Sequence, residues 1–253
     1  MVKASLKKDS RDMLTHLIYG LQILTNRAYI NCHYTYYRLF HTDIRDRIDR
    51  ILEFNEKDVN LPEGQQEEQA LPGCTKYRKS GYYKYMLSRY LYCLKYIKEK
   101  TVLDCASGLG WGSFLISDYP EKLLSIDIND DALDFSSTRW KHDKLNFIRH
   151  SVLDLESLNQ KFDVILGYEL IEHLELSDGR LFIEQAASVL NKDGVLVLSS
   201  YFPTSPQKAR KAEKVNKYHL HIYTRDEMNS FLAESGFSKV HFLGDFMVVA
   251  KKT

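Results

Sequence analysis

The sequence is poor in cysteine, in proline and in long apolar runs. It has five prolines and four cysteines among 253 residues, and no two cysteines form a Cys-x-x-Cys pair. This spacing argues against a disulfide framework and against a zinc site. No apolar run approaches the roughly 18 residues of a membrane-spanning helix, and the N-terminus lacks the apolar core of a signal peptide. Together these absences predict a reduced, soluble, cytoplasmic protein.

An excess of charge of one sign is also missing. The formal net charge is +1, with 35 Lys and Arg against 34 Asp and Glu. Net charge therefore does not indicate a strongly basic nucleic-acid-binding protein. Hydrophobic residues make up 44% of the chain and charged residues 27%, which argues against a disordered protein. Tyrosine is abundant instead, with 17 residues.

Before residue 100, apolar residues follow the spacing of helices. Helices are expected over 43–54 and 80–98, and residues 55–75, with two prolines and a Gln/Glu-rich run, are expected to form a loop or linker. A further helix near the N-terminus is predicted from apolar residues at steps of three and four, namely Leu14, Leu17, Ile18, Leu21 and Leu24.

After residue 100, short apolar strands alternate with helices. The predicted strands are 101–105, 122–127, 145–150, 162–167 and 194–200. The predicted helices between them are 111–118, 130–140 and 178–190. This alternation predicts a parallel sheet that is covered on both faces. A helix over 224–236 then leads to two apolar segments separated only by Gly244 and Asp245, a connection short enough to require an antiparallel hairpin.

A glycine-rich turn after the first predicted strand is the most informative motif. Asp104 lies near the end of that strand, and Gly108, Gly110 and Gly112 follow before a helix. Glycines let a backbone approach a ligand closely, and a helix N-terminus offers unpaired N–H groups. A nucleotide-binding turn and a tight strand–helix turn both fit this pattern. Asp127, at the end of the second strand, favours a nucleotide because its carboxylate can accept hydrogen bonds from ribose hydroxyls.

The spacing of these motifs distinguishes between two kinds of nucleotide ligand. A dinucleotide site would prefer GxGxxG and a second βαβ half, whereas this chain has GxGxG and ends in a hairpin. Residues 101–253 resemble class I S-adenosylmethionine-dependent methyltransferases. DCASGLG is similar to the family's D-x-G-x-G-x-G loop, with Ala106 at the first glycine position, and IDIND supplies the ribose acid. HSVLDL is similar to the adenine-contacting segment, with Ser151 where an Asp is usual.

The resemblance implies a fold, a division of the chain and a cofactor. The implied fold is α/β, a Rossmann-like seven-stranded sheet, parallel with a C-terminal antiparallel hairpin, behind a helical N-terminal extension. Residues 1–75 would form the extension and linker, and residues 76–253 the methyltransferase domain, with its core from residue 101. The residues implied to bind S-adenosylmethionine are Asp104, Ala106, Ser107, Gly108, Gly110, Asp127, Ile128, Ser151, Val152 and Asp154.

Acidic residues and an imidazole are concentrated after the fourth predicted strand. Glu169 and Glu172 are three residues apart, so on a helical turn they would share a face, and His173 follows directly. With His219, this resembles the ExxEH…His arrangement of some metal-dependent O-methyltransferases, including small-RNA 2′-O-methyltransferases and some quinone-pathway enzymes. The resemblance implies that these four residues bind Mg²⁺ or a transition metal. Two alternatives stand beside it: His173 is a general base without a metal, or the segment only caps and packs a short helix.

Two segments carry local positive charge despite the balanced total. Residues 76–100 have eight lysines and arginines against one glutamate, and residues 205–217 have five against one. Beside an active site they would suit an anionic acceptor such as a phosphorylated sugar, a nucleotide-sugar or a polysaccharide, whereas as solvated helix faces they would have no such role. The tyrosines of the first segment either stack on sugars or bases or pack the helix.

Three hypotheses about function follow. The combination of SRY, CASGLGWGS and YELIEHL resembles O-methyltransferases of sugars, and residues 1–75 would then cover the site, select the acceptor or form a homodimer contact. An RNA or DNA methyltransferase that uses the two basic segments is the second hypothesis, and it predicts a steep salt dependence of binding. The third is an inactive interaction protein with a methyltransferase fold, which Ala106 and Ser151 keep open.

Overall fold

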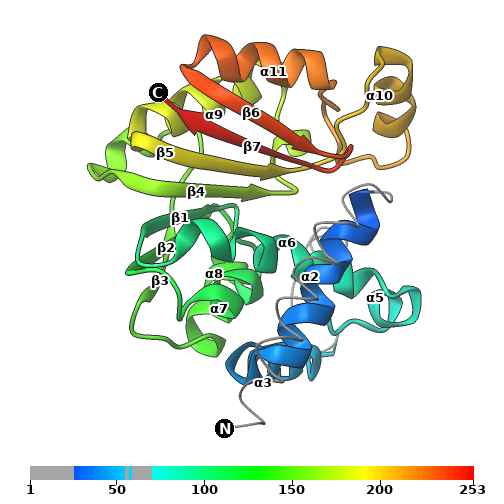
Figure 1. Ribbon diagram of the computed structural model, residues 1–253, viewed down its shortest axis with the longest axis vertical. Coiled ribbons are helices and arrows are strands. Elements are labelled where there is room, and N and C mark those ends of the chain that lie inside the picture. The colour runs from blue at the N-terminus through cyan, green and yellow to red at the C-terminus, as the bar shows by residue number, and fades with distance from the viewer. Residues whose placement is uncertain (1–25, 55–56, 59–69) are drawn as a thin grey trace, which may run out of the picture.

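The centre of the molecule is a seven-stranded sheet with the strand order β3-β2-β1-β4-β5-β7-β6 (Figure 1). The computed structural model describes residues 26–54, 57–58 and 70–253. Strands β1 to β5 pair in parallel, and β7 runs antiparallel to both β5 and β6. This topology confirms the fold class expected from the sequence. The strands are β1 (Thr101–Cys105), β2 (Lys122–Asp127), β3 (Leu145–Arg149), β4 (Phe162–Tyr168), β5 (Leu190–Ser199), β6 (Phe237–Leu243) and β7 (Met247–Lys252).

Helices cover both faces of this sheet. Successive side chains of a strand point to opposite faces, and in β1 Val102 belongs to one apolar core while Leu103 belongs to the other. The first core is shared with α3, α6, α7 and α8, and the second with α9 and α11. The helices are α2 (Asn26–Phe40), α3 (Thr42–Leu52), α5 (Thr75–Ser80), α6 (Tyr82–Ile97), α7 (Trp111–Ile116), α8 (Asp130–Arg139), α9 (Leu176–Val189), α10 (Pro206–Glu213) and α11 (Arg225–Glu234).

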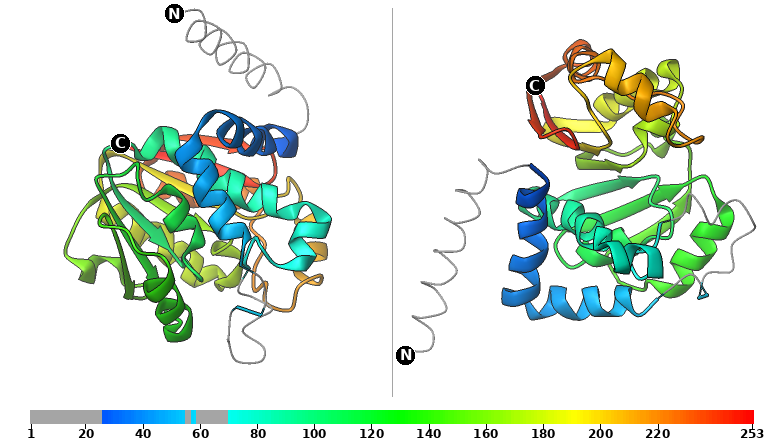
Figure 2. Two further views of the ribbon diagram at one scale, coloured as in Figure 1. Left: turned by 90° about the horizontal axis from the view of Figure 1, so that it is seen from below. Right: turned by 90° about the vertical axis from the view of Figure 1, so that its right-hand side faces the viewer.

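The N-terminal helices pack onto the first of these faces. α2 lies along α6, and α3 contacts α7 (Figure 2). The apolar face expected for the segment 43–54 is present in α3, where Ile44, Ile48 and Ile51 are fully buried. The predicted helix with Leu14 and its neighbours lies outside the described residues. The division of the chain at residue 75 stays a prediction.

Several elements differ from the sequence-based expectation, and the helices predicted before residue 100 did not include α2 or α5. β5 begins at Leu190 rather than at residue 194, because Leu190 pairs with Phe162 before the register shifts and continues with Val195 opposite Val164. The polar residues between Leu190 and Val195 are typical of a loop, so the sequence did not indicate this part of the strand. Helix α10 was not predicted because its sequence lacks an apolar periodicity, and in the structure only Ala209 of this helix is buried. None of the helices in the described ranges is long and apolar enough to cross a membrane.

Candidate functional site

The turn after β1 surrounds a buried carboxylate, that of Asp104. The Ser113 hydroxyl donates a hydrogen bond to Oδ2 at 2.5 Å, and the Tyr90 hydroxyl donates to the same oxygen at 3.1 Å. Burial, with a smaller contribution from the negative charge of Asp127, raises the pKa of Asp104 to about 7. The two hydrogen bonds oppose this shift because they stabilise the charged form. Asp104 therefore changes charge near neutral pH.

The glycines of this turn are required by packing as well as by backbone conformation. Gly110 has φ of +68°, and a Cβ atom there would lie 2.6 Å from the ring of Phe147. A Cβ atom on Gly112 would lie 2.0 Å from the ring of Tyr90. Ala106, at a position where the resembled family has glycine, adopts φ of +54°, in the left-handed region that favours glycine. The turn thus keeps its shape despite this substitution.

Asp127 connects the turn after β1 with the turn after β2. Its Oδ2 accepts a hydrogen bond from the backbone N–H of Gly108 at 2.8 Å, and its Oδ1 accepts from that of Asn129 at 2.9 Å. Ile128, the next residue, is 66% exposed. A fixed carboxylate beside an exposed apolar side chain offers acceptors for ribose hydroxyls and a surface for a base. The geometry fits the binding roles implied for both residues.

The turn after β3 contains the remaining implied cofactor residues. Val152 is buried, Ser151 is partly exposed and Asp154 is exposed. The Ser151 hydroxyl accepts a hydrogen bond from the backbone N–H of Leu153 at 3.2 Å, so it is tied into its own turn. Asp154 precedes the short 3₁₀ helix η2 (Leu155–Leu158) without capping it through its side chain. Contacts of these residues with adenine stay a prediction.

Glu169 does not share a helical face with Glu172, so that expectation is wrong. The 3₁₀ helix η3 covers only Ile171–His173, and Glu169 has φ of +51°, outside the helical range. Its backbone N–H donates to the carbonyl oxygen of Ser199 at 2.9 Å, and its Oε1 accepts from the Ser199 hydroxyl at 2.8 Å. These bonds hold Glu169 against the end of β5.

Arg89 of α6 is the ion-pair partner of Glu169. Its Nη1 lies 2.5 Å from Oε1 of Glu169 and donates to the Ser199 hydroxyl at 3.2 Å. Burial alone would lower the pKa of Arg89, but the charge of Glu169 and three neighbouring tyrosines outweigh it, so the pKa of the guanidinium is raised. Arg89 is only 4% exposed, so it is not part of the solvated basic surface expected over 76–100. Its apolar surroundings in the sequence, YMLSRYLYCL, were the available sign of burial.

Glu172, His173 and His219 form a compact group beyond β4. One possible ligand atom of each residue lies within 4.8 Å of those of the other two. Glu172 is 3% exposed, and its Oε2 has no hydrogen-bond partner. Burial first, and then the charge of Glu169, raises the pKa of Glu172 to about 8. Three of the four residues implied as metal ligands are therefore together, while Glu169 is engaged by Arg89.

The two histidines of this group are held by different hydrogen bonds. Nδ1 of His173 lies 3.1 Å from the carbonyl oxygen of Tyr218, which can only accept, so Nδ1 carries a proton and Nε2 is the ring nitrogen left for other partners. His219 lies 3.1 Å from the Asn216 amide through Nε2, and its buried Nδ1 has no partner. Burial and the neighbouring His173 lower the pKa of His219. Neutral imidazoles of this kind serve as bases and as metal ligands.

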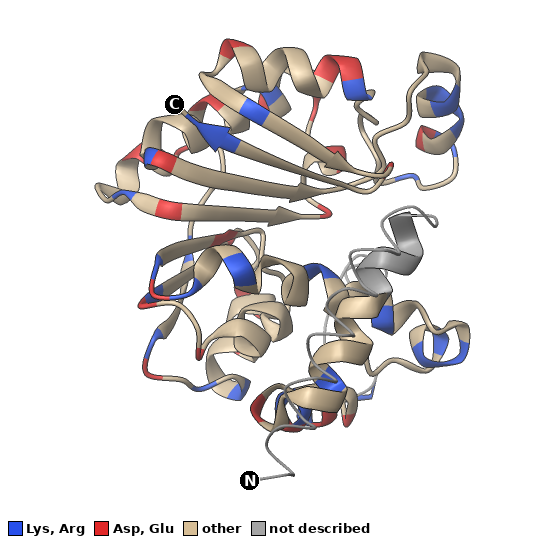
Figure 3. Ribbon diagram, in the orientation of Figure 1, with Lys and Arg blue, Asp and Glu red and all other residues tan. Residues whose placement is uncertain are grey.

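Helices α5 and α10 each carry several basic residues (Figure 3). Both helices lie on the side of the molecule toward which β4 and β5 point in Figure 1. On α10 and the residue after it, four cations are exposed and form no ion pair with the described residues, namely Lys208, Arg210, Lys211 and Lys214. The tyrosines of α6 mostly pack the helix, since Tyr85, Tyr90 and Tyr92 are buried.

Comparison with known proteins agrees with this geometry. Residues 102–194 match the family model described as "Methyltransferase domain". A Mycobacterium tuberculosis protein described as a probable S-adenosylmethionine-dependent methyltransferase is 25% identical over 147 residues, which cover 58% of this chain and 52% of that protein. A Saccharomyces cerevisiae protein with the same description is 26% identical over 142 residues, covering 54% of this chain and 47% of that protein. The chain spans about half the length of the curated relatives it matches.

Solved structures share the fold at low sequence identity. One is the magnesium protoporphyrin IX methyltransferase of Synechocystis PCC 6803, solved with bound SAH. Its TM-score is 0.55 at 14% identity, and the match covers 85% of this chain and 96% of that chain. A SAM-dependent methyltransferase of Archaeoglobus fulgidus has a TM-score of 0.55 and 18% identity, covering 66% and 91%. The chain therefore has the Rossmann-like methyltransferase fold of these structures, and its residues 102–194 match the methyltransferase-domain model.

Proposed function

We propose that this protein transfers the methyl group of S-adenosylmethionine to a hydroxyl group of a carbohydrate, such as a sugar, a nucleotide-sugar or a polysaccharide. The observation that carries the proposal is the placement of two different groups at the carboxyl ends of the parallel strands. One is the glycine-containing turn with Asp104 and Asp127, and the other is the cluster of Glu172, His173 and His219. The first suits the donor and the second suits deprotonation of an acceptor.

The donor side fits the chemistry of S-adenosylmethionine. Asp127 presents an ordered carboxylate to a ribose, and Ile128 presents an exposed apolar side chain to a base. Asp104 places a titrating carboxylate beneath the turn, where a cationic amino group would favour its charged form. When bound, the cofactor supplies an electrophilic methyl group on its sulfonium. The protein then has to orient the acceptor oxygen in line with that group and to exclude water.

The acceptor side supplies a place for the hydroxyl proton. A hydroxyl is a weak nucleophile, so its proton must move to a base or its acidity must rise. His173 fits the role of base because the Tyr218 carbonyl accepts from its Nδ1, which leaves Nε2 as the nitrogen that can take the hydroxyl proton in the neutral imidazole. A sulfur or carbon acceptor would make less use of such a group.

A divalent metal at the same cluster is the alternative to this metal-free base, because a His173 that binds a metal through Nε2 has no lone pair for the hydroxyl proton. The residues that would hold it are Glu172, His173 and His219, whose unpartnered Glu172 Oε2 and His219 Nδ1 are buried. Glu169 would act on the cluster through its charge. Carboxylate and imidazole together suit Mg²⁺, Mn²⁺ or a transition metal. Such an ion would act as a Lewis acid toward the acceptor hydroxyl.

The basic helices favour an acceptor that carries negative charge. The exposed cations of α10 lie a few residues before His219 in the chain, and those of α5 lie on the same side of the molecule. Cations without ion-pair partners raise the local concentration of an anionic ligand. A phosphorylated or uronate-containing carbohydrate has negative charge for this cationic surface and hydroxyl groups for the proposed methyl transfer.

The test is calorimetry with S-adenosylmethionine, followed by methyl transfer from labelled cofactor to a panel of neutral and anionic carbohydrates. We expect saturable cofactor binding and label on anionic carbohydrates, with about tenfold weaker acceptor binding in the variant Lys211→Glu/Lys214→Glu. Absence of cofactor binding at saturating concentration contradicts the whole proposal. Label on RNA or DNA, with binding that falls steeply with salt, supports the nucleic-acid hypothesis instead. Cofactor binding without turnover on any acceptor supports the inactive interaction protein.

A further inference from the structure

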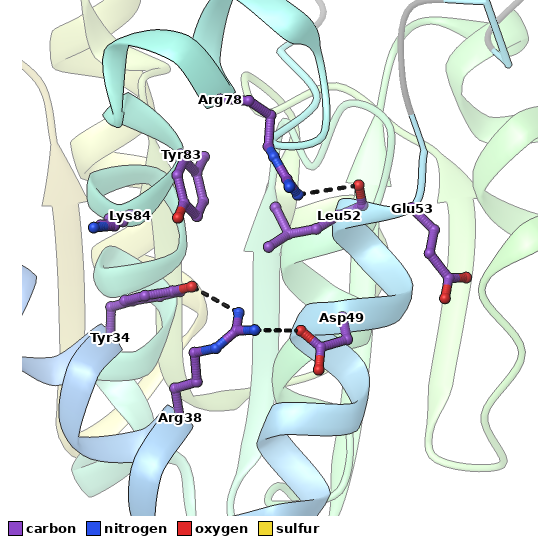
Figure 4. Close-up of a pocket in the computed structure, with 8 residues that line it drawn as sticks. All are labelled: Tyr34, Arg38, Asp49, Leu52, Glu53, Arg78, Tyr83 and Lys84. Carbon is purple, nitrogen blue, oxygen red and sulfur yellow. Dashed lines mark hydrogen bonds and ion pairs between the residues drawn. The ribbon is translucent and has the colours of Figure 1, made fainter.

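A groove lies between the N-terminal helices and the start of α6, away from the glycine-containing turn. Its volume is about 490 Å³, within the range of roughly 300–1,000 Å³ of small-ligand sites. Side chains from four helices line it. In Figure 4 Glu53 and Lys84 point away from its centre, and the other six lining side chains lie around it. The lining residues are Tyr34 and Arg38 of α2, Asp49 and Leu52 of α3, Glu53, Arg78 of α5, and Tyr83 and Lys84 of α6.

The centre of this groove is a fixed set of donors and acceptors. Arg38 donates a hydrogen bond to the Tyr34 hydroxyl at 2.8 Å and pairs with Asp49 at 2.8 Å (Figure 4). The ring of Tyr83 meets that of Tyr34 edge to face, with centroids 5.7 Å apart. Burial first, and then a hydrogen bond with Tyr83, raises the pKa of Tyr34 to about 12, so this hydroxyl remains protonated and can donate.

These side chains select for a polar ligand of low charge. The charged side chains around its centre are Arg38, Arg78 and Asp49, and Arg38 is paired with Asp49, so the groove lacks the large excess of one sign that a strongly charged ligand requires. Leu52 is the one aliphatic side chain among the lining residues, so an apolar ligand would find little surface. A planar guanidinium beside a carboxylate offers donors and acceptors to adjacent hydroxyl groups, and a tyrosine ring offers a face to C–H groups. Carbohydrates present both kinds of group.

Helix α6 links this groove to the candidate active site. Tyr83 and Lys84 line the groove, while Arg89 and Tyr90, on the same helix, contact Glu169 and Asp104. The six residues from Tyr83 to Arg89 span about 9 Å along the helix axis. A ligand that reaches both places must therefore be longer than one sugar unit.

We propose that the groove of Tyr34, Arg38, Asp49 and Tyr83 is a carbohydrate subsite that holds a distal unit of an oligosaccharide acceptor. This inference rests on the proposed function, because it supplies that reaction with a second point of attachment for the acceptor. The helices α2 and α3 then take part in acceptor selection. They lie outside the residues 102–194 that match the methyltransferase domain.

The experiment measures carbohydrate binding directly, without S-adenosylmethionine and without turnover. The full chain is applied to a glycan array of mono- and oligosaccharides that are neutral, uronate-bearing or phosphorylated, and the best ligand is then titrated by calorimetry. The test variants are Asp49→Ala and Tyr83→Ala. The matched control is Asp46→Ala, an exposed residue of the same helix α3 that does not line the groove. Thermal unfolding of each variant verifies that it is folded.

We expect the wild type and Asp46→Ala to bind oligosaccharides alike, and Asp49→Ala to bind them roughly tenfold more weakly, as loss of a charged hydrogen-bond acceptor predicts. Monosaccharide binding should not change in the same variant. Equal weakening in Asp46→Ala and Asp49→Ala overturns the proposal, and so does a wild type that binds no oligosaccharide or binds only nucleic acid or peptide controls. If Tyr83→Ala fails to fold, Asp49→Ala alone decides. Failure of cofactor binding would count against the proposed function and leave this binding measurement intact.

Discussion

Arg89 and Glu169 form an ion pair of 2.5 Å that joins helix α6 to the end of strand β4. Arg89 is buried, whereas the side chain of Glu169 is 38% exposed. The Ser199 hydroxyl bonds to both, so three elements meet at one point. The pair thereby connects a helix that precedes the matched methyltransferase domain to the segment that carries Glu172 and His173. It also holds Glu169 in its left-handed conformation.

Replacing Arg89 should weaken both stability and catalysis. In Arg89→Met the carboxylate of Glu169 loses its partner, and we expect the free energy of unfolding to fall by about 2–3 kcal/mol. This is below the roughly 3–5 kcal/mol of a fully buried pair, because Glu169 remains partly hydrated. Urea unfolding measures the loss. A double-mutant cycle with Glu169→Gln isolates the coupling, and strictly additive effects of the two substitutions would contradict it.

Asp127 should control cofactor affinity, and its replacement should also loosen the two turns that it connects. Its carboxylate oxygens accept from two backbone N–H groups, which an amide can satisfy only through its single oxygen. We expect Asp127→Asn to bind S-adenosylmethionine roughly 10- to 100-fold more weakly in calorimetry. Asp130→Asn, an exposed acid on the following helix, is the matched control. Equal affinity of the two variants would remove Asp127 from the binding site.

The sequence predicted those parts of the structure that apolar periodicity and glycine spacing determine. Strands β1 and β2 agree with the predicted ranges, and the hairpin follows from its short connection. The proximity of Asp104 and Asp127 also follows, because the carboxyl ends of adjacent parallel strands meet at one edge. These features depend on local patterns along the chain.

The remaining features depend on contacts between distant segments. The pairing of Arg89 with Glu169 joins residues that are far apart in sequence, and local charge counting placed Arg89 on the surface. Spacing alone put Glu169 and Glu172 on one helical face, whereas hydrogen bonds between Glu169 and Ser199 hold Glu169 in a left-handed conformation. The groove beside α6 is lined by side chains from separate helices, so no sequence motif indicates it.

Stability should fall with rising pH because of Asp104. Its pKa is about 7 in the folded protein and roughly 4 in an unfolded chain, so between these values the folded state binds the extra proton. Stability from this group is therefore greatest below pH 4 and is lost progressively up to about pH 7. Urea unfolding at pH 5 to 8 should show this slope in the wild type. The neutral isostere Asp104→Asn should reduce the slope, while the raised pKa of Glu172 leaves a slope of the same sign. Parallel curves for the two proteins would contradict the assignment.

Removal of metal should abolish methyl transfer if the cluster beyond β4 holds an ion. We expect chelator to lower the rate roughly 10- to 100-fold, with recovery on addition of Mg²⁺ or Mn²⁺. His219→Ala should reduce the metal bound after dialysis, measured by elemental analysis. Glu175→Gln, at an exposed neighbouring acid, is the control. Full activity in chelator, together with loss of activity in His173→Ala, would assign His173 as a metal-free base.

Ala106 should be a point of backbone strain in the cofactor turn. A residue with a Cβ atom at φ of +54° destabilises the folded state by about 1–2 kcal/mol. Glycine removes this strain, but it also raises the conformational entropy of the unfolded chain, which cancels part of the gain in stability. We therefore expect Ala106→Gly to raise the free energy of unfolding by about 0.5–1 kcal/mol. Ala233→Gly, in the exposed part of helix α11, should lower it by a similar amount, because glycine is a poor helix former. An alanine-to-glycine substitution that stabilises the protein at Ala106 and destabilises it at Ala233 would identify strain at Ala106. Destabilisation at both positions would refute it. Unchanged S-adenosylmethionine binding in Ala106→Gly would show that alanine at this position preserves the turn that the cofactor needs.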